Sequence, residues 1–135
     1  MNVIVDASIW SLAYRRRKVL ASLHATVLAE LIQEDRVVML GMVRQEVLSG
    51  IHEELQFHQV RKTLRALPDL EVNTDDHESA ARFFNTCRAK GIQGSHTDFL
   101  ICAVAARRDL SIFTTDRDFN RFVSVLPIRL HQPGA

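Results

Sequence analysis

The chain has 135 residues, of which 47% are hydrophobic and 24% are charged, and its formal net charge at pH 7 is +1. This length predicts one domain over residues 1–135 with a real hydrophobic core, and the composition argues against a disordered chain. The small net charge excludes both a basic coat for nucleic acid and an acidic mimic of it. A polyanion would therefore have to bind to a local patch of the surface.

Cysteine content and hydropathy indicate the compartment. Cys87 and Cys102 have no partner at metal-ligand spacing, which is typical of reduced thiols in a cytosolic core. The first six residues lack the basic start and long apolar stretch of a signal peptide. No apolar run approaches the roughly 20 residues that a membrane span needs. We therefore expect a cytoplasmic protein without a membrane partner.

Short β-branched runs alternate with longer segments of helical period, a pattern typical of an α/β fold with a mostly parallel sheet. In chain order, the runs predict strands at Val3–Val5 and at residues 37–40, 70–72, 111–114 and 127–130. Apolar residues at helical spacing predict amphipathic helices around residues 20–31, 57–67 and 80–87. Residues 99–106 are apolar nearly all round, so we expect that helix to be buried.

Four acidic residues stand where these elements begin or end. Asp6 and Asp116 follow the first and fourth predicted strands, Asp98 opens the buried helix, and Glu46 lies in a short apolar segment. In an open parallel sheet, ligands bind outside the carboxyl ends of the strands. Carboxylates gathered there are natural ligands for Mg²⁺ or Mn²⁺, which can hold a phosphodiester and activate water. The pattern predicts a metal-dependent phosphodiesterase.

Each acid also has an ordinary structural interpretation. Asp6 could simply start the helix that follows it, and Glu46 could be a surface residue at the edge of an apolar stripe. Residues 95–98 fit the S-x-x-D capping box, in which the carboxylate of Asp98 accepts a hydrogen bond from the cap N–H. Capping and a role at the rim of the sheet are compatible for Asp98.

Three further side chains could support such a site. The hydroxyls of Ser8 and Thr114 could bond a ligand carboxylate or a metal-bound water, although helix capping and strand propensity explain them equally well. Asp118 could be a further ligand or support one, and the interpretation that we favour is the cap of a last short helix.

A basic run is the main candidate for RNA binding. Arg15, Arg16, Arg17 and Lys18 follow the first predicted helix, and such a run could attract a phosphate backbone toward a negatively charged site. A solvated helix face is the alternative. Arg107 and Arg108 could extend the patch, but they also suit the C-terminal end of a helix.

The motifs together resemble the PIN-domain nucleases, and in particular the VapC toxins of bacterial toxin–antitoxin modules. The likeness spans essentially the whole chain and is carried by residues 3–8 (VIVDAS), by Glu46, by residues 97–101 (TDFLI) and by residues 114–119 (TTDRDF). It implies a three-layer α/β/α domain with a parallel five-stranded sheet in the order 3-2-1-4-5.

The resemblance also implies a function. Asp6, Glu46, Asp98 and Asp116 would bind Mg²⁺, with Mn²⁺ as an alternative ion, and the reaction would be endonucleolytic hydrolysis of RNA. The protein would be a homodimer neutralised by a cognate antitoxin protein. The alternative is a PIN-like module that binds RNA or protein without cutting. A dehalogenase-type phosphatase is disfavoured because Ser8 stands where its second acid would be.

Overall fold

The computed structural model describes residues 1–14 and 19–133, with the side chains of residues 19–22 excepted. Its centre is a parallel sheet of four strands in the order β2-β1-β3-β4. Val3 of β1 lies opposite Val37 of β2 and Ser111 of β3, and Ser111 lies opposite Arg129 of β4. The strands are β1 (Val3–Val5), β2 (Val37–Val38), β3 (Ser111–Phe113) and β4 (Arg129–Leu130).

The prediction of a fifth strand at residues 70–72 is wrong. Next to β2, this segment forms only one isolated parallel bridge, between Met39 and Asp69, with the N–H of Leu70 donating to the carbonyl of Met39 at 2.8 Å. Pro68 precedes the bridge, and Asn73 soon caps the next helix, which leaves too few residues for a ladder. The other four strands have the predicted order, although β2, β3 and β4 are shorter than predicted.

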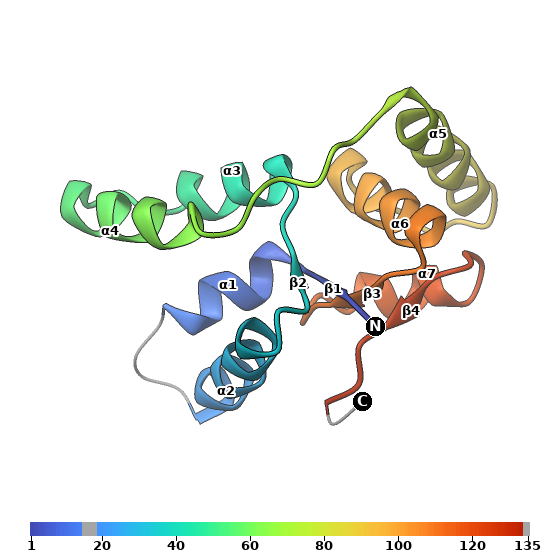
Figure 1. The fold of residues 1–135 in the computed structure, drawn as a ribbon. Helices are drawn as coiled ribbons and strands as arrows, with labels where there is room; N and C mark the ends of the chain where they lie inside the picture. The colour runs from blue at the N-terminus through green and yellow to red at the C-terminus, as the bar shows by residue number, and fades with distance from the viewer. Residues whose placement is uncertain (15–18, 134–135) are drawn as a thin grey trace.

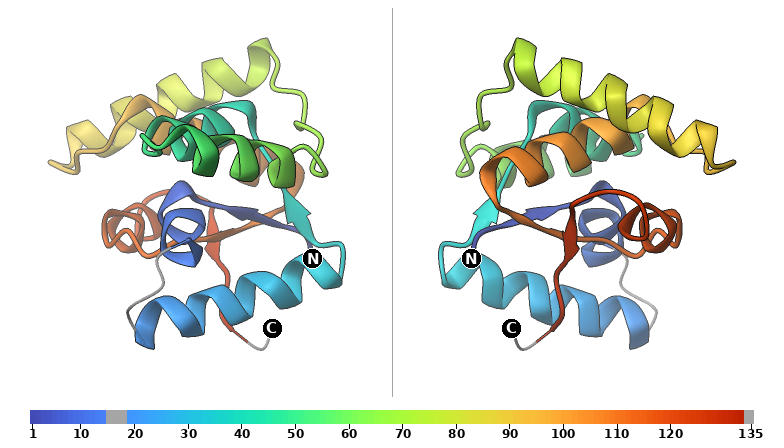
Figure 2. Two further views of the ribbon diagram at one scale, coloured as in Figure 1. Left: turned by 90° about the vertical axis from the view of Figure 1, so that its left-hand side faces the viewer. Right: turned by 90° about the vertical axis from the view of Figure 1, so that its right-hand side faces the viewer.

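Helices cover both faces of the sheet (Figure 1). Figure 2 shows α2 on one side of the strands and α3 to α6 on the other. The seven helices of the described residues are α1 (Ala7–Ala13), α2 (Val19–Gln33), α3 (Gly41–Ser49), α4 (Glu54–Leu64), α5 (Thr74–Ala89), α6 (His96–Arg108) and α7 (Asp118–Val123).

The core lies around β1, β3 and α6. All three residues of β1 and all three of β3 are buried, as expected of strands covered on both faces. In α6, residues 99–105 are all buried, which confirms the prediction of an enclosed helix. Each large apolar side chain buried in this way contributes about 1.5–3 kcal/mol. This packing fixes the start of α6, and with it Asp98, against the ends of the strands.

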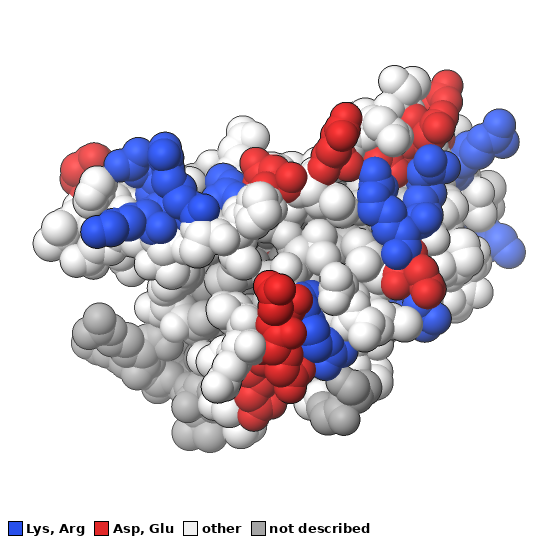
Figure 3. All heavy atoms as spheres, viewed as in Figure 1, with Lys and Arg blue, Asp and Glu red and all other residues white. Residues whose placement is uncertain are grey.

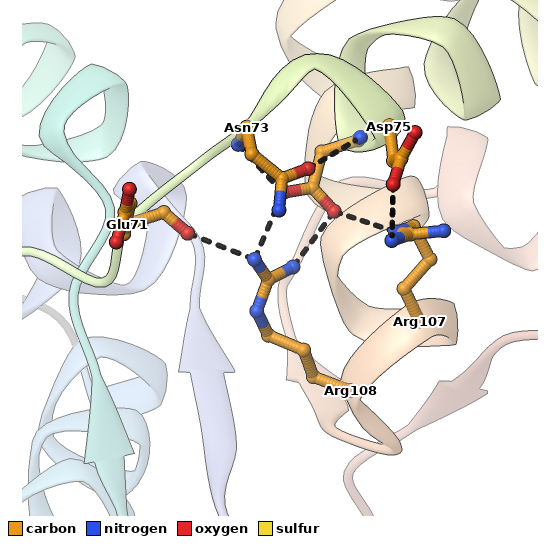
Figure 4. Close-up of polar contacts among 6 residues, drawn as sticks. Glu71, Asn73, Asp75, Arg107 and Arg108 are labelled. Carbon is orange, nitrogen blue, oxygen red and sulfur yellow. Dashed lines mark hydrogen bonds and ion pairs between the residues drawn. The ribbon is translucent and has the colours of Figure 1, made fainter.

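A buried ion-pair cluster joins the end of α6 to the start of α5 (Figure 4). Asp76 is fully buried and accepts hydrogen bonds from Arg107 at 2.9 Å and from Arg108 at 2.7 Å. Arg108 also donates to the carbonyl of Glu71 at 2.8 Å. The hydrogen bond from Arg108 is the main reason why the pKa of Asp76 falls to about 2. Both arginines are thus engaged in the fold and do not extend a basic run.

Candidate active site

A pocket of about 450 Å³ opens at the carboxyl ends of β1 and β3. It draws its walls from α1, α3, the start of α6 and the loop after β3. All four acidic residues singled out in the sequence line it: Asp6, Glu46, Asp98 and Asp116. Ala7, Ser8, Ser11, Leu12 and Thr115 complete the lining. Residues that are far apart in the chain therefore meet at the edge where an open parallel sheet binds its ligands.

Asp6 is the most enclosed of the four carboxylates, with only 6% of its surface exposed. Its Oδ2 accepts two hydrogen bonds of 2.8 Å, one from the Oγ of Ser8 and one from the Oγ1 of Thr114. Asp6 occupies the N-cap position of α1, but its side chain makes no capping hydrogen bond. The capping explanation for this acid therefore fails, and its carboxylate is oriented by two hydroxyls instead.

Asp116 lies in a loop that is held by several hydrogen bonds. Its N–H donates to the Oγ1 of Thr114 at 3.0 Å, and its Oδ1 accepts the N–H of Asp118 at 2.9 Å. The N–H of Thr115 donates to the Oγ of Ser8 at 3.2 Å, which ties this loop to α1. The two hydroxyls thus connect the ends of β1 and β3.

The structure corrects the interpretation of Asp118 as a helix cap. The N-cap of α7 is Arg117, without a side-chain capping bond, and Asp118 is the first residue of the helix. A carboxylate in the first turn is favoured by the helix dipole. Asp118 is not among the residues that line the pocket, and its described contact with Asp116 is made by its backbone N–H.

Asp98 combines two roles that the sequence left open. Its Oδ2 accepts the N–H of Ser95 at 3.1 Å, and its own N–H donates to the Oγ of Ser95 at 3.1 Å, which completes the capping box of α6. The same side chain lines the acidic pocket. Burial is the largest cause of the raised pKa of Asp98, and the nearby charges of Asp116 and Asp6 add to it.

Glu46 lies on α3 and lines the same pocket. Burial raises the pKa of Glu46 first, and the charges of Asp6, Asp98 and Asp116 raise it further. A like charge disfavours ionisation of a neighbouring carboxylate. Ionisation of Glu46 and of Asp98 therefore costs free energy, first because of burial and then because of the neighbouring carboxylates.

Comparison with known protein families identifies the fold. A family model described as PIN domain matches residues 3–124. The chain belongs to the PIN-domain family. No curated protein sequence gave a significant match.

Solved structures agree with this PIN assignment. The crystal structure of FitAcB from Neisseria gonorrhoeae and the structure of VapBC2 from Rickettsia felis bound to a promoter DNA fragment both match with a TM-score of 0.77. Each alignment covers 97% of this chain, with 97% and 98% of the respective matched chains, at 17% and 16% identity. VapBC-5 from Mycobacterium tuberculosis, a member of the VapBC family of toxin–antitoxin systems, matches with a TM-score of 0.69 at 19% identity over 98% of this chain and 99% of that chain. At such identities the likeness shows the fold alone.

The donors of this PIN domain suit a hard divalent cation, because carboxylate oxygens are the ligands that Mg²⁺ and Mn²⁺ prefer. Yet within the described part of the chain, no group of three or more His, Cys, Asp or Glu side chains is assembled as a metal site. Repulsion between the charges, which adds to burial in raising the pKa of Glu46, is a physical reason for four carboxylates to stay apart. Asp6, Glu46, Asp98 and Asp116 remain predicted ligands.

Two features around the pocket were not predicted. Ser11 lines it one turn beyond Ser8 on α1, and its three-residue spacing from Ser8 could have indicated this. Thr115 lines it between Thr114 and Asp116.

The predicted RNA-binding residues Arg15, Arg16, Arg17 and Lys18 lie outside the described residues. Within the described ranges, no helix is long and apolar enough to cross a bilayer.

Proposed function

We propose that this protein is a Mg²⁺-dependent endoribonuclease, with Mn²⁺ as a substitute ion, and that it acts as the toxin of a toxin–antitoxin module. The observation that carries the proposal is the meeting of Asp6, Glu46, Asp98 and Asp116 in one pocket at the carboxyl edge of the sheet. Several carboxylates that share a pocket without a positively charged partner cost folding free energy, and a purely structural role gives no reason for that cost. Such a cluster would suit a divalent ion, which would offset the negative charge of the carboxylates.

The chain's own residues would prepare this chemistry in three ways. Asp6, Glu46, Asp98 and Asp116 supply the negative charge that holds the ion, while Ser8 and Thr114 fix the orientation of Asp6 through hydrogen bonds of 2.8 Å. The bound ion would supply a Lewis acid for the phosphate and would lower the pKa of the attacking water. No Cys, Ser or His nucleophile is required.

The similarity to VapBC structures suggests the partners of this chain. VapBC2 and VapBC-5 both carry the VapBC name, and VapBC-5 is described as a member of a family of toxin–antitoxin systems. We propose an RNA substrate, a cognate antitoxin protein and a homodimer for this chain. Exposed apolar side chains on α2, such as Leu23 and Ile32, offer surface for association.

A catalytically silent binding module is the second candidate function. It would use the same fold to hold RNA or a protein and would not depend on the charge of the pocket. The raised pKa values of Glu46 and Asp98 favour the enzyme. They mean that ionising these carboxylates costs free energy, and a bound cation would offset that cost.

Growth under induced expression separates the two functions in cells. The wild-type chain should arrest bacterial growth, and Glu46→Gln should abolish the arrest while the protein accumulates to the same level. Glu71→Gln, an equal change at an exposed residue outside the pocket, should arrest growth like the wild type. Equal arrest by all three proteins would contradict cleavage as the cause and support the binding module.

A further inference from the structure

Four exposed basic side chains lie around the end of α5 and the start of α7: Arg88, Lys90, Arg117 and Arg121. On the face of the molecule drawn in Figure 3, the Lys and Arg side chains form separate groups with Asp and Glu side chains near them. Among the residues that the structure describes, none of the four has a carboxylate within ion-pair distance. Most other arginines of known position are held by acids, including Arg44, Arg107, Arg108 and Arg129. These four charges are therefore available to an anionic partner.

Sequence adjacency and one hydrogen bond relate these basic residues to the acidic pocket. Arg117 directly follows Asp116, and Arg121 lies one helical turn further along α7. The Nη2 of Arg121 donates to the carbonyl of Gly91 at 3.5 Å, which links α7 to the loop after α5. In both views of Figure 2, α7 and the C-terminal end of α5 lie at the edge of the molecule opposite the N-terminus. The basic residues therefore belong to elements at one edge, and Arg117 joins this edge to the loop that bears Asp116.

A second pocket, of about 270 Å³, opens between the end of α5 and the start of α6. Its lining includes Phe84, Arg88, Gln93 and Phe99. The guanidinium carbon of Arg88 lies 6.0 Å from the centre of the Phe84 ring, which is a cation–π distance. The volume is slightly below the roughly 300–1,000 Å³ typical of small-molecule sites, so the pocket suits a fragment such as one base of a longer ligand.

Close packing behind the pocket keeps its shape fixed. A Cβ atom at Gly94 would lie 2.5 Å from Cζ of Phe122 and 3.0 Å from Cε2 of Phe99, so only glycine lets the loop approach these rings. The rings of Phe99 and Phe122 are 4.9 Å apart. Arg121 precedes Phe122 on α7, and its contact with the carbonyl of Gly91 joins it to the same loop between α5 and α6.

We propose that this edge binds the single-stranded RNA that flanks the cleavage point. Arg117 and Arg121 neutralise phosphates next to Asp116, and an unpaired base enters the pocket beside Phe84 and Arg88. Aromatic rings and guanidinium planes are the surfaces on which unpaired bases stack, whereas a duplex would keep its bases inside. This inference rests on the proposed function, because it takes RNA to be the substrate of the acidic pocket.

Binding of a short labelled single-stranded RNA, measured by fluorescence anisotropy with EDTA present to prevent cleavage, tests the phosphate contacts. Arg117→Ala/Arg121→Ala should bind at least about ten-fold more weakly than the wild type. Its slope of log affinity against log salt should be shallower by about 1.4, since each neutralised phosphate of a single strand accounts for about 0.7. The matched control is Lys62→Ala/Arg65→Ala, which removes two exposed charges from the end of α4 and its cap. It should bind like the wild type.

A second variant tests the base pocket. Arg88 is exposed, so Arg88→Ala should leave the melting temperature unchanged. Its affinity for the single strand should fall about five-fold or more, in keeping with the cost of losing one stacked base. Its affinity for a duplex of the same sequence should stay within two-fold of the wild type, a change of about 0.4 kcal/mol.

The outcomes separate this inference from the proposed activity. If the wild type cuts RNA but Arg117→Ala/Arg121→Ala and its control bind equally, the edge is not the RNA path and the inference is wrong. The inference is also wrong if Arg117→Ala/Arg121→Ala keeps its affinity for RNA and loses affinity for a poly-glutamate peptide, since the edge would then be a protein-binding surface. If the binding changes appear as expected and the wild type cuts no RNA, the RNA path stands and the nuclease proposal fails.

Discussion

The Oγ1 of Thr114 donates a 2.8 Å hydrogen bond to the Oδ2 of Asp6, across 108 positions of the chain. The bond is possible because β1 and β3 are neighbours in the sheet, so the residues that follow them meet at one edge. Ser8 donates to the same oxygen. Asp6 Oδ1 accepts no hydrogen bond from the described residues and is not among their fully buried unpaired atoms, which leaves it available to the pocket.

Removal of the Thr114 hydroxyl should weaken metal binding while leaving the fold intact. Thr114→Val keeps the shape of the side chain but removes one of the two orienting bonds to Asp6 and the acceptor of the Asp116 N–H. Loss of such support typically reduces metal affinity about 10–100-fold. Titration with Mn²⁺ by isothermal calorimetry measures the change. Thr86→Val, the same substitution on the exposed side of α5, serves as the control and should bind like the wild type.

Without metal, the protein should lose stability as the pH rises from the acidic side. The pKa values of Glu46 and Asp98 are raised in the folded state, so their protonated forms favour folding. This contribution is complete below their ordinary values of 4.5 and 3.8 and is lost as the pH rises through the raised values. Melting temperatures in EDTA should therefore fall across that window, and Mg²⁺ should reduce the fall. Glu46→Gln should flatten the profile, and a profile unaffected by this change would contradict the electrostatic coupling.

Loss of Asp76 should destabilise the fold strongly. Asp76→Ala removes a capping box and leaves Arg107 and Arg108 without their buried partner, at a cost of about 3–5 kcal/mol. In the wild type, the lowered pKa of about 2 means that stability is present above the ordinary value of 3.8 and is lost as the pH falls toward 2. Urea unfolding measures both effects. Asp75→Ala is the control, because Asp75 is exposed and 3.5 Å from Arg107, and it should cost less than about 1 kcal/mol.

Neutralisation of Asp98 should abolish RNA hydrolysis without lowering the melting temperature. An asparagine at this position can still accept the hydrogen bond from the Ser95 N–H, so the capping box persists while one ligand charge is lost. Asp109→Asn at the other end of α6 is the matched control, since asparagine also tolerates the left-handed conformation of that residue. Full hydrolysis by Asp98→Asn at saturating Mg²⁺ would remove Asp98 from the proposed ligand set.

Much of this architecture could be predicted from the sequence, because it depends on local patterns. The apolar run of β1 and the enclosed helix α6 both appear as predicted, since burial on all sides requires apolar residues throughout. The capping box of Asp98 was also visible as Ser95 three residues earlier. The approach of four acids to one pocket followed from the rule that parallel strands bind ligands at their carboxyl ends.

What could not be predicted depends on long-range contacts. The segment after Pro68 looked like a strand, yet it forms one bridge, because Asp69 is held by Arg44 and the α5 cap follows at Asn73. Arg108 looked like a free basic residue, and its partner Asp76 lies 32 positions away. The aromatic pocket of Phe84 and Arg88 needs the close approach of Gly94 to Phe122, which no sequence period encodes.

Cleavage of RNA by the purified protein tests the central claim most directly. Total RNA is incubated with the wild type and with Asp116→Asn, each in Mg²⁺ and in EDTA, and the fragments are separated on a denaturing gel. The account predicts discrete fragments from the wild type in Mg²⁺ alone, and no fragments from Asp116→Asn at equal folded concentration. Equal cleavage by the two proteins, or cleavage by the wild type that persists in EDTA, would contradict it.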